Sequence, residues 1–302
     1  MYDYIIIGGG PAGSTVAYCL QKSGARCVII EKKLELNEKT CGGLLTWSGI
    51  DLLKQIGLDV DALFEKGATR INQFEYIENG KKIIHRYHDG EYGLGIRRTL
   101  LDQWLLEQAR IKGADVIFGM DFKNIINCDN QFSVGKYSAS NLIIATGANG
   151  FVPPTMLSEI HNQTFGLSAQ IKGKTSLQEN SVFFFSLEKD EEDYFWIIPN
   201  GNHVWNIGIW FKKIPTDAIT QFWKYKKEIV DKYFSDILFV RSLRGAFCGN
   251  IDFSSYLPSG CYGVGDFSGT NRSSTGEGLR YAIESSISLA HFLENTKDLN
   301  AY

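Results

Sequence analysis

The stretch YIIIGGGPAG at residues 4–13 decides the fold. Its apolar run predicts a short strand, and Pro11 suits the first turn of a helix that we expect to continue as far as residue 22. Gly24 ends this helix, and a second strand is predicted over residues 26–31. A strand, a glycine-rich turn, a helix and a second strand in this order are typical of a parallel sheet that binds a nucleotide at its edge.

Three glycines in the stretch have the GxGxxG spacing, and each has a steric role. Gly8 permits a tight turn, Gly10 lets the backbone approach a pyrophosphate, and Gly13 lets the helix pack on the strand. The N–H groups at the start of the helix would bind the phosphates. An acid about 20 residues further on binds the ribose hydroxyls in such sites, and Glu31 ends the second strand. The expected dinucleotide contacts are Gly8, Gly10, Pro11, Ala12, Gly13, Glu31 and Lys32.

Patterns of both strand and helix continue through the first half of the chain. Alternating apolar residues lie on both sides of Asn79-Gly80, a dipeptide suited to a tight turn, and predict a hairpin that leaves the first domain. Later strand patterns would return the chain to the first sheet. In order, we expect a helix over 48–56, a hairpin over 71–86, a helix over 99–112, and strands over 115–118 and 141–146.

Aromatic residues become frequent between about residues 152 and 244, mostly in alternating strand patterns. The last part of the chain again resembles the material of the first domain, with a short strand before a long helix. In order, we expect strands over 181–186, 194–198 and 204–210, a helix over 218–233, a strand over 261–264 and a helix over 276–294.

We therefore predict an α/β fold with two interleaved domains. One is Rossmann-like, a parallel sheet with crossover helices, and the other is a mostly antiparallel β-sheet domain that would cover the substrate. The first is expected over residues 1–70, 96–150 and 246–302, and the second over residues 71–95 and 151–245.

Composition and charge argue against several classes of function. The chain has 302 residues, 44% of them hydrophobic, and a net charge of only −3, so we expect neither nucleic acid nor an anionic membrane as a partner. The six cysteines lack CxxC pairs, and His85 and His88 lack a third ligand, so we predict no disulfide framework and no metal site. No apolar run is long enough to cross a bilayer. We expect a cytoplasmic monomer or small homo-oligomer that acts on a small molecule.

Three further segments resemble, in sequence and in order, the flavoprotein group that includes aromatic hydroxylases, flavin halogenases and geranylgeranyl reductases. Residues 98–102 (RTLLD) match the RxxxD pattern of this group, and residues 145–147 (ATG) match its turn after a returning strand. Residues 263–266 (GVGD) are similar to its late GD motif, whose acid binds ribitol or ribose hydroxyls. The resemblance implies FAD as the cofactor. The contacts that it implies in this chain are Arg98, Asp102, Ala145, Thr146, Gly147, Gly265 and Asp266.

Two more segments resemble the geranylgeranyl reductase branch of this group, whose members hydrogenate isolated prenyl double bonds. Residues 39–44 (KTCGGL) resemble its CGG segment, and residues 194–201 (YFWIIPNG) resemble its YxWxFPxG segment. The chain departs from the pattern at Ile198, where phenylalanine is usual, and at residues 273–275 (SST), where the proline before GEG is missing. These departures leave the substrate open.

Tyr194 and Trp196 alternate along a predicted strand, so their side chains point the same way and can form an apolar wall above the flavin. The alternative is that both are ordinary core aromatics, as we expect for Trp205 and Trp210. With Cys41, these two residues are our candidate catalytic residues.

The Cys41 thiol precedes two glycines, so it could lie at the flavin and donate a proton to a substrate carbon. The alternative is an inert, buried thiol. Gly42 would let the backbone approach the flavin, and the start of the last helix would stabilise the negative charge of the reduced ring. The additional flavin contacts that we expect are Cys41, Gly42, Gly276, Gly278 and Leu279.

Three functions are compatible with these observations. The sequence favours an FAD-dependent oxidoreductase that reduces or dehydrogenates a carbon–carbon or similar double bond of an apolar or aromatic small molecule, by hydride transfer at flavin N5. The alternative is an FAD-dependent monooxygenase or halogenase that uses a flavin hydroperoxide on a small aromatic or apolar substrate. A third is a non-catalytic redox carrier. A second GxGxxG is missing, so we expect reduction by transiently docked NAD(P)H, free reduced flavin or another external donor.

Overall fold

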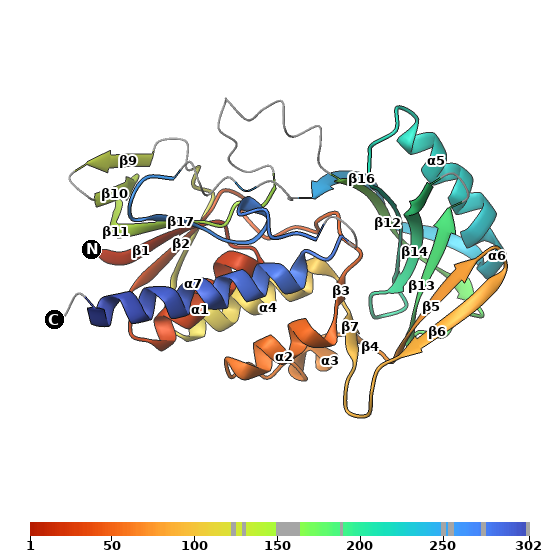
Figure 1. Ribbon diagram of the computed structural model, residues 1–302, viewed down its shortest axis with the longest axis horizontal. Helices are drawn as coiled ribbons and strands as arrows, with labels where there is room; N and C mark the ends of the chain where they lie inside the picture. The colour runs from red at the N-terminus through yellow and green to blue at the C-terminus, as the bar shows by residue number, and fades with distance from the viewer. Residues whose placement is uncertain are drawn as a thin grey trace.

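The computed structural model describes residues 1–121, 125–128, 131–148, 164–187, 190–248, 252, 257–272 and 276–299. Figure 1 shows two halves side by side along the longest axis of the molecule, each built around one large sheet, with a small sheet between them. The segments 149–163 and 273–275, which include the predicted start of the second domain and the departure from the GEG pattern, lie outside the described residues.

The sheet of the first half has the strand order β8-β2-β1-β11-β10-β9, with β17 also paired to β11. Strands β8, β2, β1, β11 and β17 are mutually parallel, whereas β10 and β9 are antiparallel additions at one edge. The strands are β1 Tyr2–Ile7, β2 Cys27–Glu31, β8 Asp115–Phe118, β9 Ile125–Cys128, β10 Gln131–Val134, β11 Tyr137–Ile144 and β17 Cys261–Gly263.

Three helices cover one face of this sheet, α1 Pro11–Lys22, α4 Arg98–Ile111 and α7 Leu279–Leu299, with α1 packed between the other two (Figure 1). Strand β1 is buried on both faces: Ile5 and Ile7 pack in one apolar cluster while Ile6 packs with the helices in another. Full burial of such a side chain contributes about 1.5–3 kcal/mol, so this central strand contributes strongly to the stability of the first half. The glycine-rich turn extends directly from it.

The sheet of the second half has the order β16-β12-β15-β14-β13-β5-β6, antiparallel except for the parallel pair β13 and β5. Its strands are β5 Gln73–Glu78, β6 Lys81–Arg86, β12 Thr164–Thr175, β13 Ser181–Leu187, β14 Asp190–Pro199, β15 Trp205–Phe211 and β16 Phe234–Cys248. The helices α5 Ala218–Tyr225 and α6 Asp231–Tyr233 lie on its outer side, separated by a π-helical turn over Lys226–Val230 (Figure 1).

A three-stranded sheet lies between the halves, formed by β3 Leu44–Leu45, β7 Gly93–Gly95 and β4 Thr69–Ile71. The helices α2 Trp47–Gln55 and α3 Ala62–Glu65 lie beside it (Figure 1). Because β3 follows the segment that carries the CGG residues, this small sheet fixes where that segment leaves the first half.

Side chains alternate across the large antiparallel sheet, so each face has its own set. Phe195 and Ile197 on β14 are fully buried and pack with Trp205 under the outer helices. Trp196 and Ile198 belong to a separate cluster on the opposite face, together with Trp210. That second face, which we call the inner face, is the one whose residues contact the first half.

The predicted α/β fold, with a parallel sheet and a separate, mostly antiparallel sheet, is confirmed. The residue limits of the two domains stay a prediction. The expected helix over 218–233 is interrupted by a π turn, and the last helix begins at Leu279 rather than Gly276. The β9–β10 hairpin was not predicted, because its strands are too short to give a clear pattern. No helix in the described residues is long and apolar enough to cross a membrane.

Candidate flavin site

The glycine-rich turn owes its shape to contacts that only glycine allows. A Cβ atom on Gly8, which has φ +110°, would overlap the carbonyl oxygen of Ala145, and one on Gly13 would overlap the carbonyl oxygen of Gly8. These close approaches bring residues 145–147 beside the start of α1. Gly10 is the N-cap of α1 and makes no side-chain cap, so the first N–H groups of the helix are available to a phosphate.

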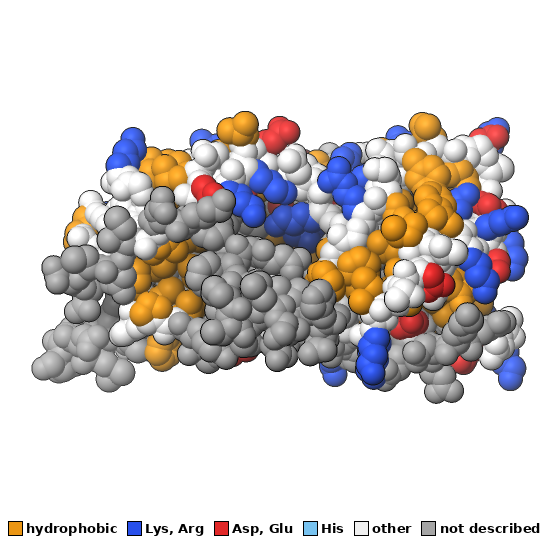
Figure 2. Space-filling model, turned by 90° about the horizontal axis from the view of Figure 1, so that it is seen from above, with side chains coloured by type: hydrophobic (Ala, Val, Ile, Leu, Met, Phe, Trp, Pro, Cys, Tyr) orange, Lys and Arg blue, Asp and Glu red, His pale blue; other side chains and the backbone are white. Residues whose placement is uncertain are grey.

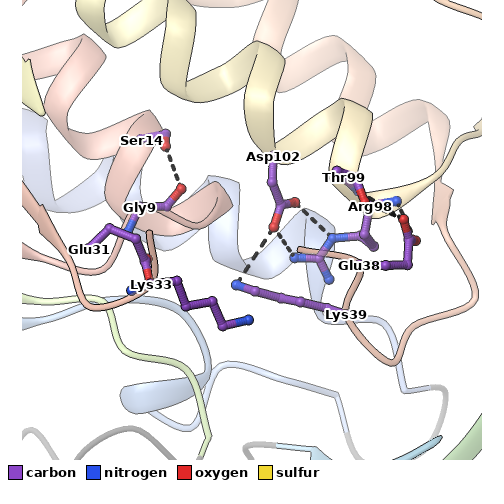
Figure 3. A network of polar contacts seen from close by, with 9 residues as sticks. All are labelled: Gly9, Ser14, Glu31, Lys33, Glu38, Lys39, Arg98, Thr99 and Asp102. Atoms are coloured by element: carbon purple, nitrogen blue, oxygen red, sulfur yellow. Dashed lines mark hydrogen bonds and ion pairs between the residues drawn. The ribbon is translucent and has the colours of Figure 1, made fainter. Parts of the chain in front are cut away.

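Glu31 lies at the end of β2 and is held in a fixed orientation at this turn. Its Oε2 accepts a hydrogen bond from the Gly9 N–H at 2.9 Å, and its Oε1 accepts one from the Lys33 N–H at 3.1 Å (Figure 3). The residue is only 7% exposed. The carboxylate is therefore positioned where an adenosine ribose would lie against the turn, whereas Lys32 is exposed.

Arg98 and Asp102 form a buried ion pair on α4. The guanidinium donates from Nε to Oδ1 at 2.9 Å and from Nη2 to Oδ2 at 3.0 Å. The pKa of Arg98 is raised although burial alone would lower it, because the charges of Asp102 and Cys41 favour the cation. Lys39 extends toward the same carboxylate, with its Nζ 3.6 Å from Oδ2 (Figure 3).

The ammonium of Lys39 also lies at the glycine-rich turn. A Cβ on Gly10 would be 3.0 Å from Lys39 Nζ and, apart from its two chain neighbours, would meet no other heavy atom of the described residues within 4 Å. The space above Gly10 is thus open except for a flexible cation. This is the environment that a pyrophosphate requires, and Lys39 was not among the predicted contacts.

Asp266 lies near the same group of charges, although it is far away in sequence. Burial raises the pKa of its carboxyl, while Arg98, Asn271 and Lys39 act in the opposite direction. A Cβ on Gly278 would be 2.7 Å from the Asn271 amide nitrogen and 3.4 Å from Asp266 Oδ1, so Gly278 lies directly beside the acid. Gly265 packs against Ala12 at the start of α1. The RxxxD and GD segments therefore meet at the glycine-rich turn.

These residues fit FAD. Among the described residues, the side-chain oxygens of Thr15, Thr146 and Asn271 are buried and have no hydrogen-bond partner, which is costly unless a ligand supplies one. They come from α1, from the ATG turn and from the segment after the GD motif, so the unsatisfied groups surround the same turn. Together with the open space above Gly10, they would hold the phosphates, ribose and ribitol of the cofactor.

The CGG segment crosses from the first half to the inner face of the antiparallel sheet. Asn206 Nδ2 donates to the Cys41 carbonyl at 2.7 Å, and Asn200 Nδ2 donates to the Gly42 carbonyl at 3.0 Å. A Cβ on Gly42 would be 2.8 Å from Ile198 Cδ1, so a larger residue would not fit there. The backbone of this segment is therefore pressed against strands β14 and β15.

Tyr194 and Trp196 lie on the inner face as predicted, with ring centroids 6.2 Å apart. Trp196 covers Gly208 on β15, and its Nε1 donates to Asn206 Oδ1 at 2.8 Å. Trp210 also lies on this face, with its ring stacked 6.3 Å from Tyr194. It is buried in a core cluster, as predicted. Gly276 packs on the Trp210 ring, which brings the segment just before α7 to the inner face.

Glu38 is a second junction between the halves, and sequence reasoning missed it. Its carboxylate accepts hydrogen bonds from the Arg98 and Thr99 N–H groups, and so caps the N-terminus of α4 (Figure 3). It also accepts one from Gln170 Nε2 on β12 at 3.0 Å. The sequence did contain a signal. The amides Gln170 and Asn206 each lie within an otherwise apolar strand pattern, where a buried polar group requires a partner.

Comparison with known proteins identifies the family of this fold. Residues 1–240 match the model of the FAD binding domain family. The chain belongs to this family. FAD is therefore its cofactor, and the chain is placed among the FAD-dependent oxidoreductases.

Relatives with curated names are distant. Digeranylgeranylglycerophospholipid reductase of Methanosarcina mazei is 26% identical to this chain over an alignment 320 positions long. The alignment covers 94% of this chain and 72% of the relative. Conditioned medium factor receptor 1 of Dictyostelium discoideum is 25% identical, and the match covers 95% of this chain. This chain spans only 62% of the length of that receptor.

Solved structures share the fold across nearly the whole chain. A geranylgeranyl bacteriochlorophyll reductase-like protein from Thermoplasma acidophilum has a TM-score of 0.83 at 18% identity, with 99% of this chain and 79% of that chain covered. The halogenase PltM has a TM-score of 0.80 at 18% identity, with 99% and 70% covered. The resemblance to the reductase and halogenase group that the sequence indicated is thus confirmed at the level of family and fold.

Proposed function

We propose that this protein reduces, or in the reverse direction dehydrogenates, a carbon–carbon or similar double bond of an apolar or aromatic small molecule. The observation that carries the proposal is the contact of the CGG segment with the inner face, where Gly42 lies against Ile198 and beside Trp196. A substrate beside this contact would have the aromatic side chains of the inner face on one side and the CGG segment on the other. The name of the Methanosarcina mazei relative, a reductase of a geranylgeranylated lipid, supports the same chemistry.

Bound FAD in its reduced form would supply the hydride, and the chain has to supply a proton and a dry, oriented pocket. Tyr194, Trp196 and Trp210 would hold the apolar part of the substrate and exclude water. Cys41 would donate the proton from Sγ to the substrate carbon that does not receive the hydride. The two hydrogens then add across the double bond while the flavin is oxidised.

Two contacts fix the position of Cys41. Its sulfur accepts a hydrogen bond from the Gly43 N–H at 3.4 Å, and it also interacts with the buried Arg98 guanidinium. Electrons would come from NAD(P)H, free reduced flavin or another external donor, and a proton from water would restore the thiol.

The proposal is tested by the composition of the product. The FAD-loaded protein is incubated under nitrogen with dithionite and a panel of branched alkenes, styrenes and unsaturated acids, and the products are measured by mass spectrometry. We expect a product that has gained two hydrogen atoms and that forms without oxygen. A product that forms only in air and contains an added oxygen atom, or a halogen in the presence of halide, would overturn the proposal in favour of a monooxygenase or halogenase.

A further inference from the structure

Arg241 on β16 carries buried donors that no described residue satisfies. Its Nη2 donates to Ser168 Oγ on β12 at 2.8 Å, but Nε and Nη1 are buried and have no hydrogen-bond partner among the residues that the structure describes. Ser168 is fully buried on the inner face, so its hydrogen bond holds the partly exposed Arg241 side chain against that face. Unsatisfied donors on a cation are costly, which makes this arrangement unfavourable unless a ligand accepts from them.

The Glu38 carboxylate, whose charge acts on Arg241, is already bound to other groups. Glu38 accepts from the Arg98 and Thr99 backbones, from the Thr99 hydroxyl and from Gln170, and Arg97 Nε lies 3.7 Å from it. The charge of Arg241 is correspondingly poorly compensated: burial, and then the neighbouring Arg244, lower its pKa, while Glu38 and Cys41 only partly offset this. An incoming anion would satisfy both the hydrogen bonds and the charge.

The position of Arg241 relative to the aromatic wall defines what such an anion could belong to. Arg241 is paired with Gln170 on β12, Gln170 with Asn206 on β15, and Asn206 with Ile198 on β14. Arg241 and Ile198 are therefore three strands apart on one face, which corresponds to roughly 14 Å, and Trp196 is the next residue of that face along β14. Seen from above, Lys and Arg side chains gather where the two halves meet, beside an apolar stretch on the half with the antiparallel sheet (Figure 2).

We propose that Arg241 binds the anionic head group, a carboxylate or a phosphate, of a substrate whose apolar body lies along the inner face as far as Trp196. The inference deepens the proposed function and rests on it. Arg241 then selects acidic amphiphiles over neutral alkenes of the same shape, and it fixes how far the reacting double bond lies from the head group. Ser168 keeps the guanidinium oriented toward the ligand.

Three probes with one branched alkenyl tail test the head group: citronellol, citronellic acid and citronellyl phosphate. Each is titrated into the FAD-loaded protein by isothermal calorimetry. A new hydrogen bond to a charged group contributes about 1.5–3 kcal/mol, so we expect one or both anions to bind about tenfold or more tightly than the alcohol. Comparing the affinities of citronellic acid and citronellyl phosphate shows whether the site prefers a carboxylate or a phosphate.

Arg241→Met is expected to remove the preference for the anions while binding of the alcohol is unchanged, and Arg241→Lys should restore part of it. The matched control is Arg86→Met, which removes an exposed cation from β6 at the opposite edge of the same sheet and should keep the preference. FAD content and the midpoint of urea unfolding are measured for every variant to verify folding.

Equal binding of the three probes, no binding of either anion, or a preference that survives Arg241→Met would each overturn the inference. Loss of FAD from Arg241→Met with folding intact would assign the residue to the cofactor and would overturn it as well. Because calorimetry needs no turnover, the head-group preference can hold even if no double bond is reduced. That result would reject the proposed reaction and retain the anion site.

Discussion

Asp102 holds Arg98 by two hydrogen bonds one helical turn away, and the same carboxylate lies 3.6 Å from Lys39 Nζ. One buried acid therefore compensates two cations, one directed toward Cys41 and the other toward Gly10. The Arg98–Asp102 pair connects the region around Gly10, which would bind phosphate, with the region around Cys41, which would carry out the chemistry. This explains why an acid four residues after the arginine belongs to the motif.

Asp102→Asn should destabilise the protein by about 3–5 kcal/mol, because it leaves the buried Arg98 cation without its partner. The measurement is urea unfolding of the FAD-free protein. Glu107→Gln on the same helix is the control: its ion pair with Arg110 is exposed, so a change below about 1 kcal/mol is expected. Equal effects of the two substitutions would contradict the role of the buried pair.

Gly10→Ala should fold normally and lose FAD. Among the described residues, the added methyl would meet only the flexible Lys39 ammonium, but it occupies the space that the pyrophosphate needs. Gly9→Ala is the matched control, because a Cβ there meets Glu31 and Leu106 at 3.5 Å or more and the N–H that binds Glu31 remains. Flavin absorbance after gel filtration measures retention. If Gly10→Ala retains FAD as fully as the control, the pyrophosphate does not lie over Gly10.

Local patterns predicted the elements and the glycine-rich turn, because their causes lie within a few residues. The hairpin at Asn79-Gly80 is an example, with φ values of 47° and 74° that suit this dipeptide. The junctions between the halves could not be found in this way. Glu38 meets Gln170 across 132 positions, and Asn206 meets Cys41 across 165, and such pairings depend on strand order and on which face of a sheet is covered. An amide within an apolar strand predicts a partner, not its identity.

Asp266→Asn should stabilise the FAD-free protein at neutral pH and have no effect in acid. Burial raises the pKa of Asp266 above its ordinary value of 3.8, so the folded state holds this proton more tightly than the unfolded state does. Stability from this group is complete below that value and is lost as the pH rises toward the folded pKa. Unfolding free energies of both proteins between about pH 3 and pH 7 check the difference. A difference that is constant with pH would contradict the shift.

Asn206→Leu should loosen the contact between the CGG segment and the antiparallel sheet. Asn206 is fully buried, accepts from Trp196 Nε1 and donates to the Cys41 carbonyl, so its loss leaves two buried polar groups without partners. Each such group costs about 1–3 kcal/mol. We expect a corresponding fall in the free energy of unfolding, together with a changed tryptophan emission spectrum. Asn72→Leu, at an exposed position between β4 and β5, is the control. An unchanged emission spectrum would argue against the contact with Trp196.

Cys41→Ala should retain FAD and slow only the proton transfer. The side chain is not required for the backbone contact with Asn206, and residues that would hold the phosphates lie elsewhere, so flavin content should equal that of the wild type. Loss of a positioned general acid lowers the rate by about 10²–10⁴-fold, and Cys41→Ser should recover little of it because a hydroxyl is a far weaker acid. Single-turnover oxidation of the reduced protein by the substrate measures the step. Normal turnover in Cys41→Ala would remove the proton-donor role, and loss of flavin in this variant would make the thiol structural.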